Sequence, residues 1–253
     1  RFIQNRKKFP LEKTAHYDLV HAARRVWKKR LRNCSLNNIE KEVLGLKRQG
    51  DVPGYLIPQL WLHYLDTGDA RPLAPVFYHH EMDILSLAAL TGYLAKRLAA
   101  DSNTTFHHAE DRLAIVRLYV KNKDYESAIT EAQRFLENPQ EGNELRRECL
   151  TLLGQSYKRT ELFEEMVAAW LLLHEEFPGN IYAAAELAKY REHQERNYGD
   201  AIKICEKTLA HIAANPLPED FSVSALRGRL LRLEKKQARL RARSKNEDPD
   251  FPE

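Results

Sequence analysis

A histidine and an aspartate four residues apart are the side chains in this sequence best suited to chemistry. They are His79 and Asp83, in the segment VFYHHEMDILSL over residues 76–87. Positions i and i+4 of a helix share one face, so a helix here would place the imidazole beside the carboxylate. A carboxylate oxygen is a hard ligand of the kind that Mg²⁺ and Mn²⁺ prefer. Purely structural pairs have the same spacing, so the pair gains meaning only from its surroundings.

A run of basic residues upstream of this pair could contact a polyanion. It surrounds Trp27 and consists of Arg24, Arg25, Lys28, Lys29, Arg30 and Arg32. Cations beside an aromatic ring can bind phosphates and stack on bases. A solvated helix face has the same composition, and both readings remain open.

Charge is distributed unevenly along the chain. Residues 1–100 carry 17 Lys and Arg against 9 Asp and Glu, residues 101–226 carry 14 against 22, and residues 227–253 carry 9 against 5. Such segregation favours separate modules. The basic first module suits a nucleic-acid partner, whereas the acidic middle does not.

Several classes of protein are excluded by what the sequence lacks. The three cysteines, Cys34, Cys149 and Cys205, are far apart and form no CxxC pair, so neither a disulfide framework nor a zinc site is expected. A reducing, cytoplasmic setting is the default for such a chain. No apolar run reaches the length of a membrane span, and there is no phosphate-binding glycine loop or nucleophile elbow.

The pattern of the first hundred residues predicts mainly helices. Residues 1–9 resemble the last turn of a helix that Pro10 ends. Residues 16–20 could form a strand. Asp18, near the end of this strand, would then cap the following helix or lie near a metal site. Further helices are expected over residues 20–30, 36–44, 57–65 and 76–98.

A repeating pattern begins near Leu113. The segments KNKDYESAI, KRTELFEEM and QERNYGDAI recur, and their small or apolar positions Ala128, Met166 and Ala201 lie 38 and 35 residues apart. This spacing, with Gly154 three residues before Tyr157, resembles tetratricopeptide repeats, which stack helical hairpins. A plain helical bundle is the alternative. Tyr157 and Trp170 are expected to pack in the core.

The C-terminal part predicts a basic helix. Ala225–Arg243 is amphipathic and basic, and it could cap the repeats or bind nucleic acid. The segment 244–253, with two prolines and mixed charge, is expected to be disordered. The predicted organisation is therefore residues 1–100, repeats over 101–216, a basic capping helix over 217–243 and a tail over 244–253.

Five blocks in the first hundred residues resemble the YprB-type, DnaQ-like (ribonuclease H-fold) 3′→5′ exonuclease domain, in its C-terminal half. The His79–Asp83 block is the last of them. The other four are HYDLVHAARRVW at 16–27, CSLNNIE at 34–40, DVPG at 51–54 and YLDTGD at 64–69. The resemblance implies a mostly α chain: an incomplete α/β ribonuclease H-like domain with at most one or two strands, followed by helical repeats.

The resemblance also implies an active site. The family uses four carboxylates, two divalent metal ions and a Tyr or His that orients or deprotonates the attacking water. Here Asp83 would bind Mg²⁺ or Mn²⁺, and His79, rather than Tyr78, would act on the water. The other three carboxylates are expected upstream of Arg1, so the chain by itself is expected to be inactive.

Two hypotheses for function follow. In the first, the chain is part of a metal-dependent 3′→5′ exonuclease-like protein that binds nucleic acid through its N-terminal basic module. In the second, it is a non-catalytic interaction scaffold whose repeats hold a peptide or protein partner in their groove and whose nuclease remnant binds nucleic acid. No membrane partner is expected in either case.

Overall fold

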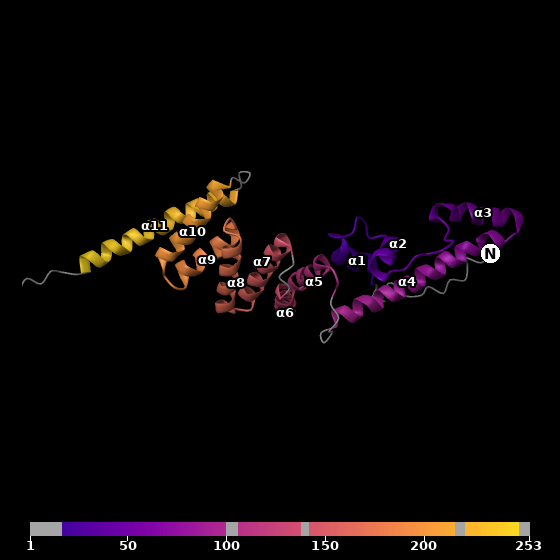
Figure 1. Cartoon of the computed structure of the whole chain (residues 1–253), viewed down its shortest axis with the longest axis horizontal. Coiled ribbons are helices and arrows are strands. Elements are labelled where there is room, and N and C mark those ends of the chain that lie inside the picture. Colours follow the sequence, from indigo (N-terminus) through magenta and orange to yellow (C-terminus); the bar gives the residue numbers. More distant parts are fainter. Residues whose placement is uncertain (1–16, 100–105, 138–141, 216–220, 248–253) are drawn as a thin grey trace, which may run out of the picture. The chain divides into compact units, whose positions relative to one another are not determined.

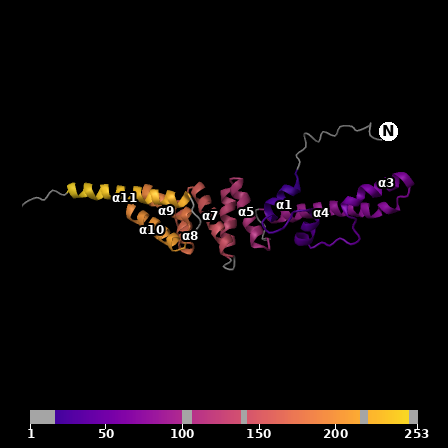
Figure 2. The ribbon, with the colours of Figure 1, turned by 90° about the horizontal axis from the view of Figure 1, so that it is seen from above.

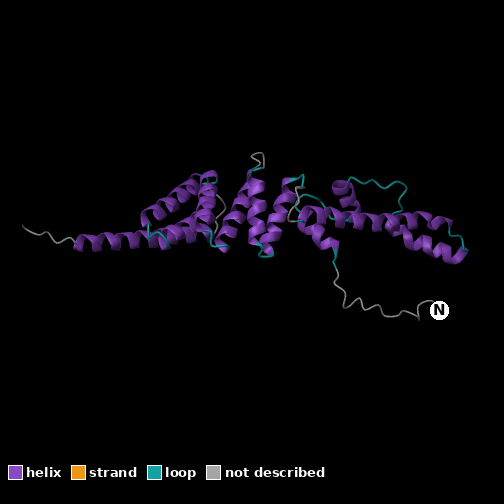
Figure 3. Ribbon diagram, turned by 90° about the horizontal axis from the view of Figure 1, so that it is seen from below, coloured by secondary structure: helices purple, strands orange, loops and turns teal. Residues whose placement is uncertain are grey.

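The computed structural model describes residues 17–99, 106–137, 142–215 and 221–247, and every regular element in these ranges is a helix (Figure 3). The predicted mostly α fold is therefore confirmed, whereas the predicted strand within residues 16–20 is absent from the described part, residues 17–20. Among the described residues no helix is both long and apolar enough to span a bilayer. The residue 1–9 segment lies outside the described residues.

The chain divides into two compact units, residues 1–111 and 112–253, and the division falls within helix α5 (Ala109–Lys121). The first unit thus extends past the predicted boundary at residue 100, because Phe106 is buried and Asp111 forms a two-pronged ion pair with Arg30, at 2.8–3.1 Å.

The first unit begins with helix α1 (Leu19–Trp27) where a strand was expected. The Asp18 carboxylate accepts a hydrogen bond from the Val20 backbone N–H at 2.9 Å and so caps the helix. This confirms the capping interpretation of Asp18. A strand also needs a partner strand for its backbone groups, and the described residues contain none.

Helix α2 (Leu36–Ile39) starts at Ser35, whose hydroxyl accepts from the Asn38 N–H, and continues as a π-helical turn over Glu40–Leu44. Gly45 ends it with φ 68°, a left-handed conformation that favours glycine. Helices α3 (Ile57–Thr67) and α4 (Ala74–Leu98) follow. Each is preceded by a single 3₁₀ turn, Gly54–Leu56 and Arg71–Leu73 respectively.

The core of the first unit lies around α1 and the end of α4. Trp27 is completely buried, and its ring lies 6.2 Å from that of Tyr93. Leu90 and Leu94 are also buried, but Ile84 and Leu85 remain 54% exposed. Apolar side chains at the start of residues 84–94 are therefore exposed, whereas those at its end are covered.

The second unit is a succession of helices, each packed against the next from α6 onward (Figures 1 and 2). After α5 come α6 (Tyr125–Leu136), α7 (Asn143–Arg159), α8 (Phe163–Glu176), α9 (Ile181–His193), α10 (Tyr198–Ala214) and α11 (Phe221–Glu247). Helix α11 continues past the predicted end at Arg243. Residues 244–247 contain neither Gly nor Pro, and the next proline is Pro249.

The same turn recurs between the paired helices of this unit. Lys123, Glu161 and Arg196 precede α6, α8 and α10, and all three have positive φ, at 63°, 60° and 54°. They lie 38 and 35 residues apart, the spacing found in the sequence. A non-glycine residue with φ > 0 is uncommon, so the repeated backbone conformation supports a repeated hairpin. The assignment to tetratricopeptide repeats stays a prediction.

Close packing between α7 and α8 depends on Gly154. A Cβ atom at this position would lie 2.7 Å from ring atoms of Trp170, which is completely buried. Tyr157 is also buried. Trp170 and Tyr157 therefore contribute to the core, as the sequence predicts.

We expect Gly154→Ala to lower the free energy of unfolding of the second unit by about 1–2 kcal/mol, because the overpacking exceeds the gain in helix propensity. The matched control is Gly228→Ala in α11, where an added Cβ meets no atom within 4 Å. This control is expected to be neutral or stabilising by up to about 1 kcal/mol. Urea unfolding followed by circular dichroism measures both, and equal midpoints for the two variants would contradict the packing argument.

Helix α11 packs against α9 and α10 and supplies three cations to one buried carboxylate. Glu192 of α9 is 2% exposed and contacts Arg229 at 3.0 Å, Arg232 at 3.1 Å and Lys236 at 2.7 Å. Burial by itself would raise the pKa of Glu192, but the hydrogen bonds from Lys236 and Arg232 lower it below its usual range. Ion pairs as well as apolar contacts therefore join α11 to the rest of the second unit.

Candidate functional site

The predicted pair of side chains lies on one face of α4. The Nε2 atom of His79 is 3.4 Å from Oδ2 of Asp83, one helical turn later. Helix α4 starts at Ala74 with Pro75 in its first turn, which presets the backbone for a helix through both residues. The sequence argument about a shared face is thus confirmed.

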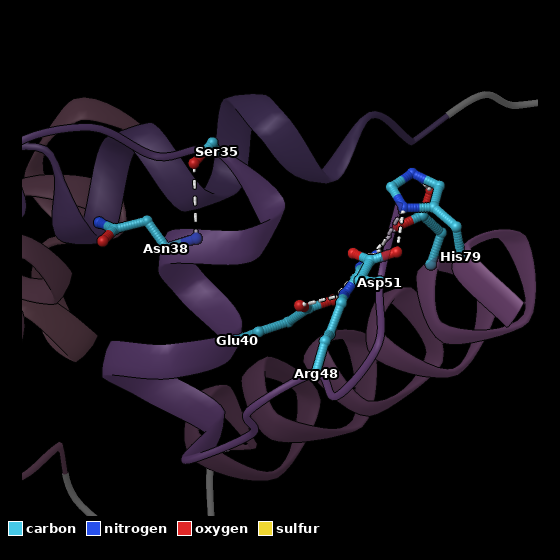
Figure 4. A network of polar contacts seen from close by, with 7 residues as sticks. Ser35, Asn38, Glu40, Arg48, Asp51 and His79 are labelled. Atoms are coloured by element: carbon cyan, nitrogen blue, oxygen red, sulfur yellow. Dashed lines mark hydrogen bonds and ion pairs between the residues drawn. The ribbon is translucent and has the colours of Figure 1, made fainter. Parts of the chain in front are cut away.

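Arg48 connects this pair to two more carboxylates (Figure 4). Its guanidinium donates to Asp83 Oδ1 at 2.6 Å, to Asp51 Oδ2 at 3.2 Å and to Glu40 Oε2 at 2.7 Å. Glu40 belongs to the π-helical turn, and Arg48 and Asp51 lie in the connection to α3. Three separate segments therefore meet at one cation.

The side chains of this network become more exposed from Glu40 to Asp83. Glu40 and Arg48 have side chains only 1% and 6% exposed, whereas the Asp83 side chain is 34% exposed. Hydrogen bonding to Glu40 raises the pKa of Arg48 further above its usual range, despite the opposing effect of burial. The guanidinium therefore stays charged, with a buried anchor on one side and an accessible carboxylate on the other.

Asp51 fixes the orientation of the His79 ring. Its Oδ1 atom lies 2.7 Å from His79 Nδ1. Burial would raise the pKa of Asp51, but the contacts with His79 and Arg48 lower it, so Asp51 is a carboxylate at neutral pH and can only accept. Asp51 therefore orients the ring through Nδ1, which Arg48 also approaches at 3.3 Å, and Nε2 faces Asp83. A carboxylate that orients a histidine in this way is a common feature of general acid–base sites.

The residues predicted to contact nucleic acid divide into two groups. The side chains of Arg24, Arg25, Lys28, Lys29 and Arg32 are exposed. Arg30 is instead only 14% exposed in its ion pair with Asp111. Trp27 is completely buried, so it has no free face on which a base could stack. The base-stacking role considered for Trp27 is therefore wrong, and only phosphate contacts remain.

Comparison with known proteins supports the resemblance seen in the sequence. A model of the RNase_H superfamily matches residues 1–95. YprB of Bacillus subtilis (strain 168) is 36% identical over 205 residues, which cover 80% of this chain and 49% of YprB. Residues 1–95 belong to a YprB-type ribonuclease H-like domain. No solved structure matches the chain, and the chain spans about half the length of YprB.

Members of the RNase H superfamily generally depend on divalent metal ions, so we asked whether this site fits one. Among the described residues, no group of three or more His, Cys, Asp or Glu side chains is placed to hold a metal ion. The Arg48 guanidinium lies between Glu40, Asp51 and Asp83, where it already balances part of their charge. The described residues of the ribonuclease H-like domain do not by themselves fit a divalent metal.

Sequence reasoning missed Glu40, Arg48 and Asp51 as members of the site. Glu40 and Asp51 were noted only as parts of family-like blocks, and Arg48 was not singled out. One signal was available for Glu40: it follows Ile39 on the apolar side of a short amphipathic helix, where an ionised residue needs a partner. Nothing in the sequence identified Arg48 as that partner.

Proposed function

We propose that this chain is part of a nuclease-like protein that processes nucleic acid, in the form of a cytoplasmic, metal-dependent 3′→5′ exonuclease. The observation that supports it most is the arrangement of Asp51, His79 and Asp83, with an oriented imidazole beside an accessible carboxylate. The similarity to the RNase H superfamily and to YprB supports the same reaction class. Three free cysteines, Cys34, Cys149 and Cys205, fit a reducing compartment.

In this proposal each site residue has a separate role. Asp83 would supply one carboxylate ligand to Mg²⁺ or Mn²⁺, and the remaining ligands would have to come from outside the described residues. His79 would hold a water molecule through Nε2 and accept its proton, while Asp51 orients the ring through Nδ1. Glu40 and Arg48 hold Asp83 and Asp51 in place.

The nucleic acid is proposed to contact the exposed cations of α1 and of the residues that follow it. Arg24, Arg25, Lys28, Lys29 and Arg32 would bind phosphates without reading sequence. Arg30 has a structural role instead, because it holds Asp111.

The test compares the full-length protein with the chain of residues 1–253. Each is incubated with 5′-fluorescein-labelled single-stranded DNA or RNA, with Mg²⁺, Mn²⁺ or EDTA. We expect the full-length protein to shorten the labelled strand from its 3′ end with metal and not with EDTA. The 253-residue chain is expected to leave the strand intact, because its described carboxylates do not make a metal site. Turnover by the 253-residue chain, or EDTA-resistant turnover, would contradict the proposal.

A second candidate function is a non-catalytic interaction protein whose tetratricopeptide-like repeats bind a partner. The contact of Arg48 with Asp83 favours it, since a cation already neutralises the carboxylate. A full-length protein that binds nucleic acid but never cleaves it, with either metal, would select this second function.

A further inference from the structure

A groove of about 500 Å³ lies between α9 and α11 in the second unit. Arg147 of α7 and the turn before α9 also line it. Its lining includes three cations, an amide, an aromatic ring and an aliphatic floor: Arg147, Lys189, Arg229, Asn180, Tyr182 and Leu226.

A second hollow, of about 560 Å³, shares Tyr182 with the first. It is lined by α7 through Gln155, Lys158 and Arg159, and by Val120 and Tyr125. The two hollows share Tyr182 of α9 in their linings, and we refer to them together as the α7–α11 groove. Five of its lining residues are cations, and no carboxylate residue lines either hollow among the described residues.

The carboxylates that hold these cations lie outside the lining. Glu186 is 6% exposed and contacts both Lys158 and Lys189, at 2.5 Å for the latter. Glu192 contacts Arg229 together with two further cations of α11. Arg147 pairs with the exposed Glu144, but each buried carboxylate serves more than one cation, which leaves an excess of positive charge on the groove side. Held cations also lose little side-chain entropy when a ligand binds.

We propose that the α7–α11 groove binds an acidic peptide segment of a partner protein, with carboxylates on the cations and apolar side chains on the floor. The proposal is supported by charge complementarity, because the five cations of the groove would attract the carboxylates of such a peptide. The positive charge of the groove contrasts with the segment around it, because residues 101–226 carry more acidic than basic residues. It would therefore attract an anion to one face of an otherwise acidic segment.

The floor favours a peptide over a single-stranded nucleic acid. Ile181, Ala185 and Ala225 line the groove with aliphatic groups, which suit aliphatic side chains better than stacked bases. Tyr182, the aromatic residue shared by the two hollows, already packs edge-on against Trp170 at 5.4 Å, and its hydroxyl accepts from Gln155. This site lies outside the ribonuclease H-like domain, so it can exist whether or not the proposed nuclease activity does.

The experiment measures binding to the intact chain by fluorescence anisotropy. The probe is a fluorescein-labelled peptide of glutamate, aspartate and leucine, and its neutral counterpart has glutamine and asparagine in place of the acids. We expect the acidic peptide to bind at least about tenfold more tightly, with an affinity that falls as salt rises. The double variant Arg147→Gln/Lys189→Gln is expected to weaken this binding by about tenfold.

A matched control is available in the same unit. Arg134 and Lys203 form i,i+3 ion pairs with Glu131 and Asp200, as Arg147 and Lys189 do with Glu144 and Glu186, but they do not line the groove. Arg134→Gln/Lys203→Gln is therefore expected to leave binding unchanged. Circular dichroism melts of both double variants check the fold.

Three outcomes would overturn the proposal. The first is equal binding, or no binding, of the acidic and neutral peptides. The second is an equal effect of the groove and control variants. The third is that an oligothymidylate probe loses affinity on the groove substitutions while the acidic peptide does not, which would assign the groove to nucleic acid.

Discussion

An Asp83→Asn substitution in the full-length protein should reduce exonuclease activity by about a hundredfold or more, the scale of losing one preorganised electrostatic group. Asparagine keeps the shape and the hydrogen bond from Arg48 but removes the negative charge. The Asp83 side chain is 34% exposed, so the fold should tolerate the change. Initial rates of strand shortening with Mn²⁺ and with Mg²⁺ measure the effect.

The control for this substitution is Asp66→Asn. Asp66 is an exposed carboxylate of α3 in the same unit, and its removal takes away the same charge. It should leave the rate unchanged. A rate for Asp83→Asn that equals the rate of this control would remove Asp83 from the active site, whereas a complete lack of activity in the parent protein would select the interaction function instead.

The Arg48→Met substitution should destabilise the first unit by about 3–5 kcal/mol, the cost of leaving a buried charge without its partner. Methionine fills a similar volume, but Glu40 would keep a carboxylate in a site that is 1% exposed. Hydrogen exchange measures the loss locally. Backbone amides of residues 36–44 and 74–98 should exchange faster, while those of α7 and α8 serve as an internal reference.

Two further variants separate a lost charge pair from a general effect of removing an arginine. Arg71 makes a two-pronged contact with Asp69, but its side chain is 91% exposed, so Arg71→Met should not change the exchange of either segment. The double variant Glu40→Leu/Arg48→Met should recover much of the lost stability, because it removes both buried charges. Equal damage from the single and double variants would contradict this account.

Local features of the fold could be predicted well because they depend on neighbours in the sequence. The helices expected over residues 36–44 and 57–65 are present, and their ends follow from local chemistry at Ser35, Gly45 and Gly68. The contact between His79 and Asp83 follows from helical spacing in the same way. The turn before each second helix recurs at the interval that the sequence shows.

What sequence reasoning missed depends on contacts between distant segments. Arg48 meets Asp83 across 35 positions, and Arg30 meets Asp111 across 81. A basic residue looks the same in the sequence whether it faces solvent or a buried carboxylate. Arg30 was therefore grouped with the exposed cations, and Arg48 was passed over. The prediction of a strand near residue 18 was wrong for a related reason, because a strand depends on a partner elsewhere in the chain.

The contacts of Glu192 also decide what α11 can offer to a polyanion. Three cations of this helix already have a counter-ion that belongs to the protein itself. A phosphate that approached them would compete with Glu192 instead of meeting an unscreened charge. If nucleic acid did bind to α11, the slope of its affinity against salt would be smaller than the charge of the helix implies, by about 0.9 for the one positive charge that Glu192 balances. The basicity of α11 therefore overstates its attraction for nucleic acid, because part of that charge is balanced within the fold.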